Sequence, residues 1–304
     1  MTGVMHPRVP ATERDRDSVS ALPNPPPTGR LEALRAFLEA HGAPPYRFRQ
    51  ISDALHQGRA ARFEDVHALP ASLRAALTQQ FGPWLVPLRL VAVQRAEAME
   101  KALFETASGA RFESVLTRYR RGWTSLCVSS QAGCGLGCTF CATGAVGLRR
   151  NLSVDEIHGQ VVHPVWRGQR PDSVAFMGMG EALANPRLLD ALARLRETGL
   201  SPRRVTVSTV GLAPRLRALT TTQPQVTVTL SVHSPFPDQR AELIPLERRY
   251  PLAENLDVLD RHVVTSRRKA YLAYLLIDGS TTRGRTPPSS RGSSTRRHAR
   301  SCST

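Results

Sequence analysis

Three closely spaced cysteines, Cys134, Cys138 and Cys141, constrain this chain more than any other feature. Thiolates are the preferred ligands of iron–sulfur clusters, and a cluster of four irons usually takes four of them. A loop that offers only three leaves one iron free to bind a small molecule. The interleaved glycines let the backbone bend around a bulky group. The spacing therefore predicts a 4Fe–4S cluster in a reactive site.

Two other uses of these cysteines fit the sequence less well. A structural zinc ion would need a fourth ligand, and the nearest histidine, His158, falls well inside a predicted helix. A disulfide framework is typical of small secreted chains. This chain has 304 residues, an odd total of five cysteines and no apolar signal segment. Reduced thiols and the missing targeting segment predict a cytoplasmic protein.

Composition and charge point to a nucleic-acid partner. The hydrophobic content of 41% is enough for a packed core, and the length allows one large and one small domain. There is no apolar run of membrane-spanning length, so we expect no membrane partner. The net charge of +16 favours a phosphate backbone as partner, although a genome biased toward arginine codons would produce the same excess.

The first 120 residues divide into three parts. Residues 1–30 are proline-rich, and we expect disorder there. We expect residues 31–85 to form a small, basic helical module, because 31–40, 46–56 and 71–77 show helical apolar spacing. Residues 86–120 form a β-rich connecting segment. Its predicted strands are 88–93, 101–106 and 111–119, with a turn at Ser108-Gly109.

Residues 121–279 show an α/β pattern in which strands and helices alternate. The predicted strands cover 124–129, 173–177, 205–208, 226–231 and 270–277. The predicted helices begin at a capping box, Ser153 to Glu156, and continue with 185–197, 214–219 and 252–264. Such repeats predict a parallel sheet with helices outside and a ligand at the carboxyl ends of the strands.

Further candidate ligand-binding residues follow the predicted strands. In Phe176-Met-Gly-Met-Gly-Glu181, Gly178 and Gly180 would let a ligand approach the backbone, and Glu181 would pair with a ligand ammonium. Ser208, Ser231 and His233 could donate hydrogen bonds to a ribose or a carboxylate. By themselves, a serine and a histidine at strand ends are more often local caps.

Together these motifs resemble one family. The run Cys127-Val-Ser-Ser-Gln-x-Gly-Cys-x-x-x-Cys-x-Phe-Cys-x-Thr is followed by Arg-Asn-Leu, Phe-Met-Gly-Met-Gly-Glu, Val-Ser-Thr, Ser-Val-His, Ile-Pro-Leu and Leu-Ile-Asp-Gly. This combination is similar to the RlmN/Cfr family of radical S-adenosylmethionine methyltransferases, which act on RNA adenines. The resemblance runs from about residue 46 to residue 279. It implies an incomplete parallel barrel preceded by a small helical RNA-binding domain.

The resemblance implies a role for each candidate residue. Cys134, Cys138 and Cys141 would hold the 4Fe–4S cluster. Glu113 matches the family's proposed proton acceptor, and Cys127 the cysteine that resolves a covalent RNA adduct. Without the resemblance, we would interpret Glu113 as an exposed carboxylate on a strand and Cys127 as a buried thiol on a strand. The implied S-adenosylmethionine contacts are Gly180, Glu181, Ser208, Ser231, Val232 and His233.

The resemblance also implies a reaction. One S-adenosylmethionine methylates a cysteine near the C-terminus, and the cluster reductively cleaves a second one to begin radical transfer of that methyl carbon to an adenine. A radical is needed because the adenine carbon is not nucleophilic. The implied substrate is 23S rRNA and possibly tRNA, with C2 the expected position and C8, the antibiotic-resistance type, the alternative. We also expect an external electron donor such as flavodoxin, and a monomer.

The chain departs from the family near its C-terminus. The family's methyl-carrying cysteine lies in a stretch resembling Arg-Gly-x-Asp-Ile-x-x-Ala-Cys-Gly-Gln, which is missing here, as is an Asn-Leu-Ile-Pro segment. The only late cysteine is Cys302, which could serve as a catalytic cysteine but lacks that context. Residues 280–304 resemble a disordered tail produced by a frameshift or a premature end. A catalytically dead RNA-binding remnant therefore remains a further alternative.

Overall fold

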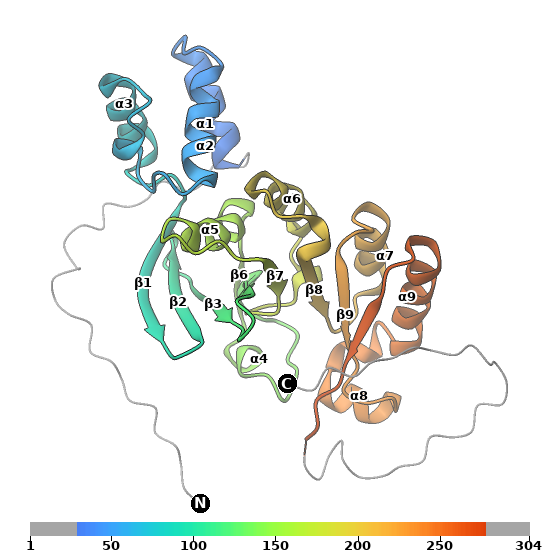
Figure 1. Cartoon of the computed structure of the whole chain (residues 1–304). Helices are drawn as coiled ribbons and strands as arrows, with labels where there is room; N and C mark the ends of the chain where they lie inside the picture. The colour runs from blue at the N-terminus through green and yellow to red at the C-terminus, as the bar shows by residue number, and fades with distance from the viewer. Residues whose placement is uncertain (1–28, 278–304) are drawn as a thin grey trace, which may run out of the picture.

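The computed structural model describes residues 29–277, in which helices and strands build a mixed α/β fold around one eight-stranded sheet (Figure 1). The strand order across this sheet is β1-β2-β3-β4-β7-β8-β9-β10. The strands span Leu88–Arg95 (β1), Met99–Thr106 (β2), Arg111–Arg118 (β3), Thr124–Cys127 (β4), Ser173–Phe176 (β7), Val205–Thr209 (β8), Thr227–Ser231 (β9) and Ala270–Ala273 (β10).

The sheet has a parallel part and an antiparallel part. Strands β4, β7, β8, β9 and β10 are parallel, as the alternation of strands and helices predicted. Strands β1, β2 and β3 extend the same sheet from β4 with antiparallel pairing. The predicted connecting segment is thus continuous with the barrel sheet, because β3 pairs with β4 from Val115 opposite Cys127 to Arg118 opposite Thr124.

Helices cover one face of the sheet, and a separate helical module lies beyond them (Figure 1). The module consists of α1 to α3, and the helices that follow the strands are α5, α6, α7 and α9. The bounds are Arg30–Ala40 (α1), Tyr46–His56 (α2), Ala71–Phe81 (α3), Val154–Val165 (α5), Leu188–Leu195 (α6), Ala213–Thr222 (α7) and Leu252–Ser266 (α9). The predicted capping box at Ser153 is confirmed, since its hydroxyl accepts the Glu156 N–H and the Glu156 carboxylate accepts the Ser153 N–H.

Alternation along the strands separates a core face from an open face of the sheet. Residues that face the helices, such as Leu126, Val174 and Val207, are fully buried. Their neighbours face the other way and are small or polar. The register places Cys127 beside Ala175 and Ala175 beside Thr206. We call this second surface the inner face, and its half-buried small residues leave room for a ligand.

Two buried contacts join the helical module to the barrel. The backbone N–H of Arg30 donates to Asp155 at the start of α5, 2.6 Å away. The Nε2 atoms of His56 on α2 and His158 on α5 lie 3.0 Å apart. Because His158 is committed to this contact inside a helix, it is not placed to serve as the fourth ligand of a zinc site.

Several short elements were not predicted from the sequence. They are the two-stranded sheet β5 and β6 (Gln131–Gly133 and Leu148–Asn151), α4 (Ala142–Val146), α8 (Pro237–Leu243) and the 3₁₀ turns Phe63–Asp65 (η2), Ala182–Ala184 (η3), Arg196–Thr198 (η4), Pro202–Arg204 (η5) and Pro245–Arg248 (η6). The predicted helix 185–197 is shorter, because Pro186 and Gly199 flank α6. Within residues 29–277, no helix is long and apolar enough to cross a membrane.

Candidate functional site

The three clustered cysteines lie on a loop that the β5–β6 hairpin holds closed. The Cys134 N–H donates to the carbonyl of Gly147 at 3.1 Å, and the Thr139 N–H donates to Leu243 at the end of α8 at 3.0 Å. Gly133 has a φ of +80°, and a Cβ atom there would overlap the Gly147 carbonyl oxygen. Only glycine therefore allows this loop closure.

All three sulfurs of the loop are free thiols that influence one another. Burial raises the pKa of Cys138 to about 11, with the two neighbouring sulfurs and Glu181 as further causes. Burial also raises the pKa of Cys134, whose sulfur accepts hydrogen bonds from the N–H groups of Leu136 and Glu181. Three thiolates this close are unfavourable without a cationic centre, so the donor set fits an iron–sulfur cluster.

A single metal ion fits this loop less well than a cluster does. Within the part of the chain that the structure describes, no three His, Cys, Asp or Glu side chains converge closely enough to hold one ion. A four-iron cube is wider than one ion, and its ligands lie correspondingly further apart. Cys134, Cys138 and Cys141 remain the predicted ligands of a cluster.

Glu181 lies beside the cysteine loop and joins it to the end of β8. Its carboxylate accepts the N–H groups of Leu183 and Val210, each at 3.0 Å, and burial raises its pKa. These hydrogen bonds, together with one from the Thr209 side chain, fix the carboxylate while leaving a further lone pair available. Its position fits the predicted role of pairing with the ammonium of an amino-acid ligand.

The two glycines before Glu181 have a different local role from the one we expected. A Cβ atom on Gly178 would lie 2.7 Å from Ser129 Oγ, and one on Gly180 would lie 2.5 Å from Gln131 Cβ. The space beside both glycines is thus filled by the end of β4 and by β5 rather than left open. Gln131 accepts the Glu181 N–H at 2.9 Å. Gly180, whose φ is +94°, remains a predicted cofactor contact through its backbone alone.

The ends of β8 and β9 bring the remaining predicted cofactor contacts to the same edge of the sheet. Ser208 is near the end of β8, Ser231 ends β9, and Val232 follows it. Ser208 pairs with Thr229 in the register, so Ser208 and Ser231 share the inner face. These residues are therefore positioned as the sequence predicted, although their ligand contacts stay predictions.

His233 is held in an unusual backbone conformation at this edge. Its φ is +55°, and its Nδ1 accepts the Leu275 N–H at 3.0 Å. Its ring packs edge-on against Phe140 of the cysteine loop, with centroids 4.8 Å apart. Burial lowers the pKa of His233, and the charge of Arg240 lowers it further, so the ring is neutral near pH 7 and presents Nε2–H as a donor.

Arg240 is a structural residue of the site that we did not predict from the sequence. It is 1% exposed and donates to the carbonyls of Val210, Ser231 and Val232, at 2.6, 2.9 and 3.0 Å. Its charge is balanced by Glu247. A single guanidinium thus ties the ends of β8 and β9 together. A buried arginine has no periodic sequence signal, so only its nearness to Ser-Val-His could have suggested it.

Cys127 and Glu113 both lie on the inner face of the sheet. Cys127 ends β4, and burial raises the pKa of its thiol, which accepts the Met177 N–H. Glu113 is on β3, and its carboxylate lies 3.2 Å from Lys101 Nζ. The register explains the shared face, because Cys127 pairs with Val115, two residues along β3 from Glu113. Cys302 lies outside the described residues.

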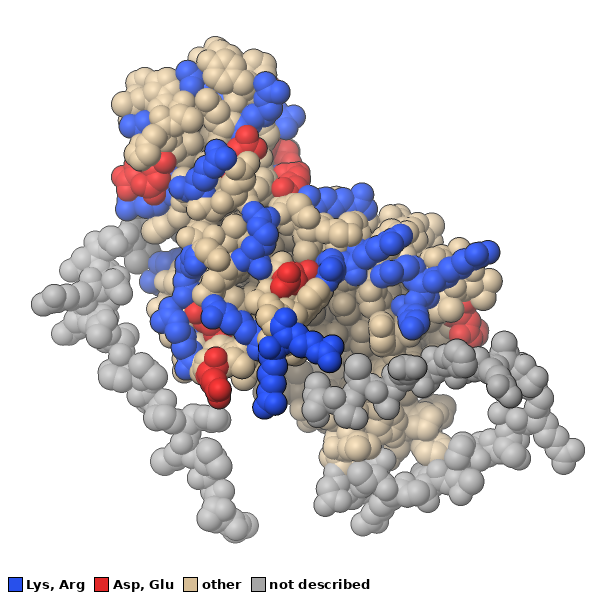
Figure 2. Space-filling view, viewed as in Figure 1, with Lys and Arg blue, Asp and Glu red and all other residues tan. Residues whose placement is uncertain are grey.

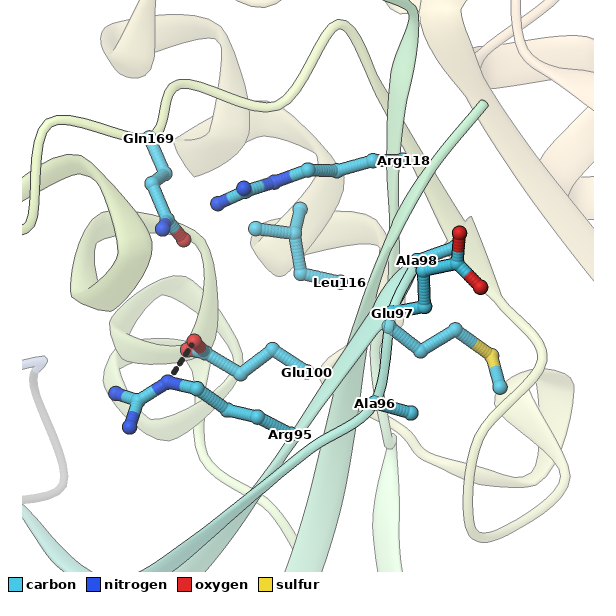
Figure 3. A pocket seen from close by; sticks show the side chains of 9 residues that line it. Arg95, Ala96, Glu97, Ala98, Glu100, Leu116, Arg118 and Gln169 are labelled. Atoms are coloured by element: carbon cyan, nitrogen blue, oxygen red, sulfur yellow. Dashed lines mark hydrogen bonds and ion pairs between the residues drawn. The ribbon is translucent and has the colours of Figure 1, made fainter. Parts of the chain in front are cut away.

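A cavity of about 170 Å³ lies away from these residues, at the turn between β1 and β2 (Figure 3). The side chains of Arg118 and Gln169 extend toward one another across it, and Arg95 pairs with Glu100 at its edge. It shares no lining residue with the predicted site. We assign it no part in the chemistry at the cysteine loop.

Comparisons with known proteins agree with this geometry. Residues 128–266 match the Radical SAM superfamily. The chain is 45% identical to "Ribosomal RNA large subunit methyltransferase Cfr" of Shouchella clausii over 82% of this chain and 72% of that relative. The Staphylococcus aureus protein of the same name is 43% identical over 81% of this chain and 71% of its own length. A solved radical SAM methyltransferase from Sphaerobacter thermophilus superposes with a TM-score of 0.76 at 36% identity, covering 82% of this chain and 75% of that one.

Fold and site together define a radical S-adenosylmethionine enzyme with a partial parallel barrel and an N-terminal helical module. At the level of identity found, the chain belongs to the RlmN/Cfr family of methyltransferases. The family predicted from the motifs is thereby confirmed, and with it the fold class and the enzyme class. A 4Fe–4S cluster and S-adenosylmethionine are the cofactors that this family implies.

Proposed function

We propose that this protein methylates a carbon atom of an adenine in 23S rRNA. One observation carries the proposal: the three-cysteine loop, Glu181 and the inner-face residue Cys127 gather at one edge of the sheet. The names of the relatives, which act on large-subunit ribosomal RNA, support the substrate class. When bound, the cluster and S-adenosylmethionine would supply a radical able to react at an adenine carbon that is not nucleophilic.

The chain's own residues would bind and orient the reactants. Cys134, Cys138 and Cys141 hold the cluster, and Glu181 fixes the ammonium of S-adenosylmethionine. Gly180, Ser208, Ser231, Val232 and His233 complete the contacts, with the His233 Nε2–H as a donor. Cys127 and Glu113, on the inner face, act on the RNA, as thiol and as proton acceptor. Cys302 stays a candidate for the methyl-carrying cysteine on sequence grounds alone.

The position of the methyl group has two candidates. C2 was the position that we expected from the resemblance, although the motifs are shared by both branches and do not separate them. The relatives that carry the name Cfr favour the C8 branch of the family instead. Digestion of 23S rRNA from cells with and without the gene, followed by mass spectrometry of the methyladenosines, separates 2-methyladenosine from 8-methyladenosine. Absence of both products would contradict the proposed function.

Charge and the helical module support RNA as the partner. Lys and Arg side chains are spread over the module and the barrel, while acidic side chains gather in a few places (Figure 2). On the module, Arg47 stacks over Tyr46 at 4.8 Å and Arg62 over Trp84 at 5.3 Å. Arginine beside exposed aromatic rings suits unpaired bases and phosphates.

We propose residues 31–85 as the RNA-binding module, 86–120 as the connecting segment and 121–279 as the catalytic barrel.

The electron source, location and assembly are also proposals. We infer a cytoplasmic monomer reduced by an external donor such as flavodoxin, with tRNA as a possible second substrate. Anaerobic reconstitution followed by assays of deoxyadenosine and methylated RNA tests the enzyme directly. Deoxyadenosine release together with RNA methylation is the expected result. Deoxyadenosine without methylation would indicate a damaged enzyme, and failure to form a cluster would indicate an RNA-binding remnant.

A further inference from the structure

Lys101 is the ion-pair partner of Glu113 on the inner face of the sheet. Its Nζ lies 3.2 Å from Glu113 Oε1, and the two side chains are 42% and 39% exposed. Strands β2 and β3 pair with Lys101 opposite Val115, and Val115 in turn lies opposite Cys127. Lys101, Val115 and Cys127 therefore form one row across three strands, with Glu113 diagonal to Lys101.

The other carboxylate on this face of β2 lies four residues from Lys101 along the strand and already has partners of its own. Glu105 lies on the same face of β2 and forms ion pairs with Arg89 and Arg111. Its two oxygens are each occupied by one guanidinium. Glu105 therefore does not compete for the ammonium of Lys101, which is left to Glu113.

The residue type at position 101 is informative in this chain. The chain has 41 lysines and arginines in total, and only Lys101 and Lys269 are lysines. A composition so biased toward arginine would place arginine wherever a positive charge alone is needed. An ammonium is smaller than a guanidinium and binds one oxygen as a point charge rather than gripping two. A lysine here leaves the second oxygen of Glu113 free.

We propose that Lys101 is the positioning residue for Glu113, holding one carboxylate oxygen so that the other faces the RNA adenine. The inference rests on the proposed function, because it takes Glu113 as the proton acceptor. The hydrogen on the adenine carbon leaves as a proton to the free oxygen of Glu113, and the electron pair of the broken C–H bond stays in the ring. Lys101 itself touches neither the adenine nor the cofactor.

The test compares two products of the same reconstituted enzyme: deoxyadenosine, which forms before Glu113 acts, and methyladenine in 23S rRNA. Lys101→Met removes the charge and keeps an unbranched side chain that is one atom shorter. We expect at least a tenfold rise in deoxyadenosine formed per methyl group, with the rate of deoxyadenosine formation within twofold of the wild type. Lys101→Arg keeps the positive charge but can grip both carboxylate oxygens, so we expect it to leave the coupling well below that of the wild type.

Two further variants separate positioning from folding. In a Glu113→Gln background, Lys101→Met adds no further loss, because the residue that it positions is already gone. Arg187→Met removes an exposed cation at the N-cap of α6, where Arg187 pairs with Asp190, and we expect it to leave the ratio of deoxyadenosine to methyladenine unchanged. The role of Lys101 would be overturned if Lys101→Met kept the wild-type ratio of deoxyadenosine to methyladenine. It would also be overturned if Lys101→Met reduced methylation equally in the wild-type and Glu113→Gln enzymes. A wild-type enzyme that releases deoxyadenosine but never methylates RNA would overturn the proposed function itself, and this role with it.

Discussion

The imidazole of His233 packs edge-on against the ring of Phe140, with ring centroids 4.8 Å apart and planes at 81°. This contact connects the end of β9 to the cysteine loop, two segments almost a hundred residues apart. Because Phe140 directly precedes Cys141, the same contact helps to position a predicted cluster ligand. Edge-to-face pairs of this kind contribute roughly 1 kcal/mol beyond the area they bury.

A double-mutant cycle of Phe140→Leu and His233→Asn measures this coupling. We expect each single variant to lower the free energy of unfolding, and the double variant to lose about 1 kcal/mol less than the sum. Urea unfolding of the apo-protein gives the four values needed. Strictly additive losses would show that the two rings do not stabilise one another.

Closure of the cysteine loop depends on glycine at position 133. Gly133→Ala places a methyl group against the Gly147 carbonyl at a φ of +80°, so the hairpin cannot close. We expect most of the bound iron to be lost. Gly137→Ala is the matched control, because its φ of +67° carries similar strain while its Cβ meets nothing within 4 Å. It should cost about 1 kcal/mol and retain iron; equal iron contents in the two variants would contradict this explanation.

The buried pair of Arg240 and Glu247 supports the ends of β8 and β9. Arg240→Met leaves Glu247 buried without its cation and frees three backbone carbonyls. We expect it to destabilise the fold by roughly 3 kcal/mol or more, measured by urea unfolding. Adding Glu247→Gln should recover part of that loss, since the uncompensated charge is removed. A double variant less stable than Arg240→Met would argue against charge compensation here.

His163 gives the fold a defined sensitivity to acid. Burial and, second, the charge of Arg167 together lower its pKa to about 4, while an unfolded histidine titrates near 6.5. Between these values the unfolded chain binds more protons than the folded one. The free energy of unfolding therefore falls as the pH drops from about 6.5 to about 4, by up to about 3 kcal/mol for this group.

Replacing the imidazole tests that dependence. His163→Phe keeps a ring against Phe104 but cannot be protonated. We expect its stability to fall less than that of the wild type between pH 6.5 and 4.5 in urea unfolding curves. His67→Phe, at an exposed position, serves as the control and should keep the wild-type slope. Identical slopes for wild type and His163→Phe would contradict the assignment.

The sequence predicted the regular elements well because their patterns are local. Alternation located β1 to β3, and the capping box at Ser153 located the start of α5. The three residues of β5 are too few to show any period, so the hairpin that closes the cysteine loop was missed. Gly178 and Gly180 were expected to face a ligand. Their neighbours, Ser129 and Gln131, come from a segment about fifty residues earlier that no local pattern connects to them.

Most residues of the candidate site could be proposed from the sequence, but not because of any periodic pattern. The cysteine spacing and the strand-end motifs combine residue types with short fixed intervals, which sequence shows directly. Arg240 and Lys101 could not be found in this way. One is a buried arginine in an arginine-rich chain, and the other acquires a partner only through the register of β2 and β3.

A second prediction about the cysteine loop distinguishes its ligands from the neighbouring thiol. Cys138→Ala should abolish the visible absorbance of the reconstituted cluster, because two thiolates cannot hold the cube. Cys127→Ala should keep it, since Cys127 lies at the end of β4, outside the loop. Loss of absorbance in both variants, or in neither, would place the iron ligands elsewhere.

Mössbauer spectroscopy of protein reconstituted anaerobically with ⁵⁷Fe tests the central assignment most directly. We predict a four-iron cluster in which one iron lacks a cysteine ligand, and a spectral change at that iron alone when S-adenosylmethionine is added. A zinc-loaded protein, an iron-free protein, or four equivalent irons that do not respond to S-adenosylmethionine would contradict it.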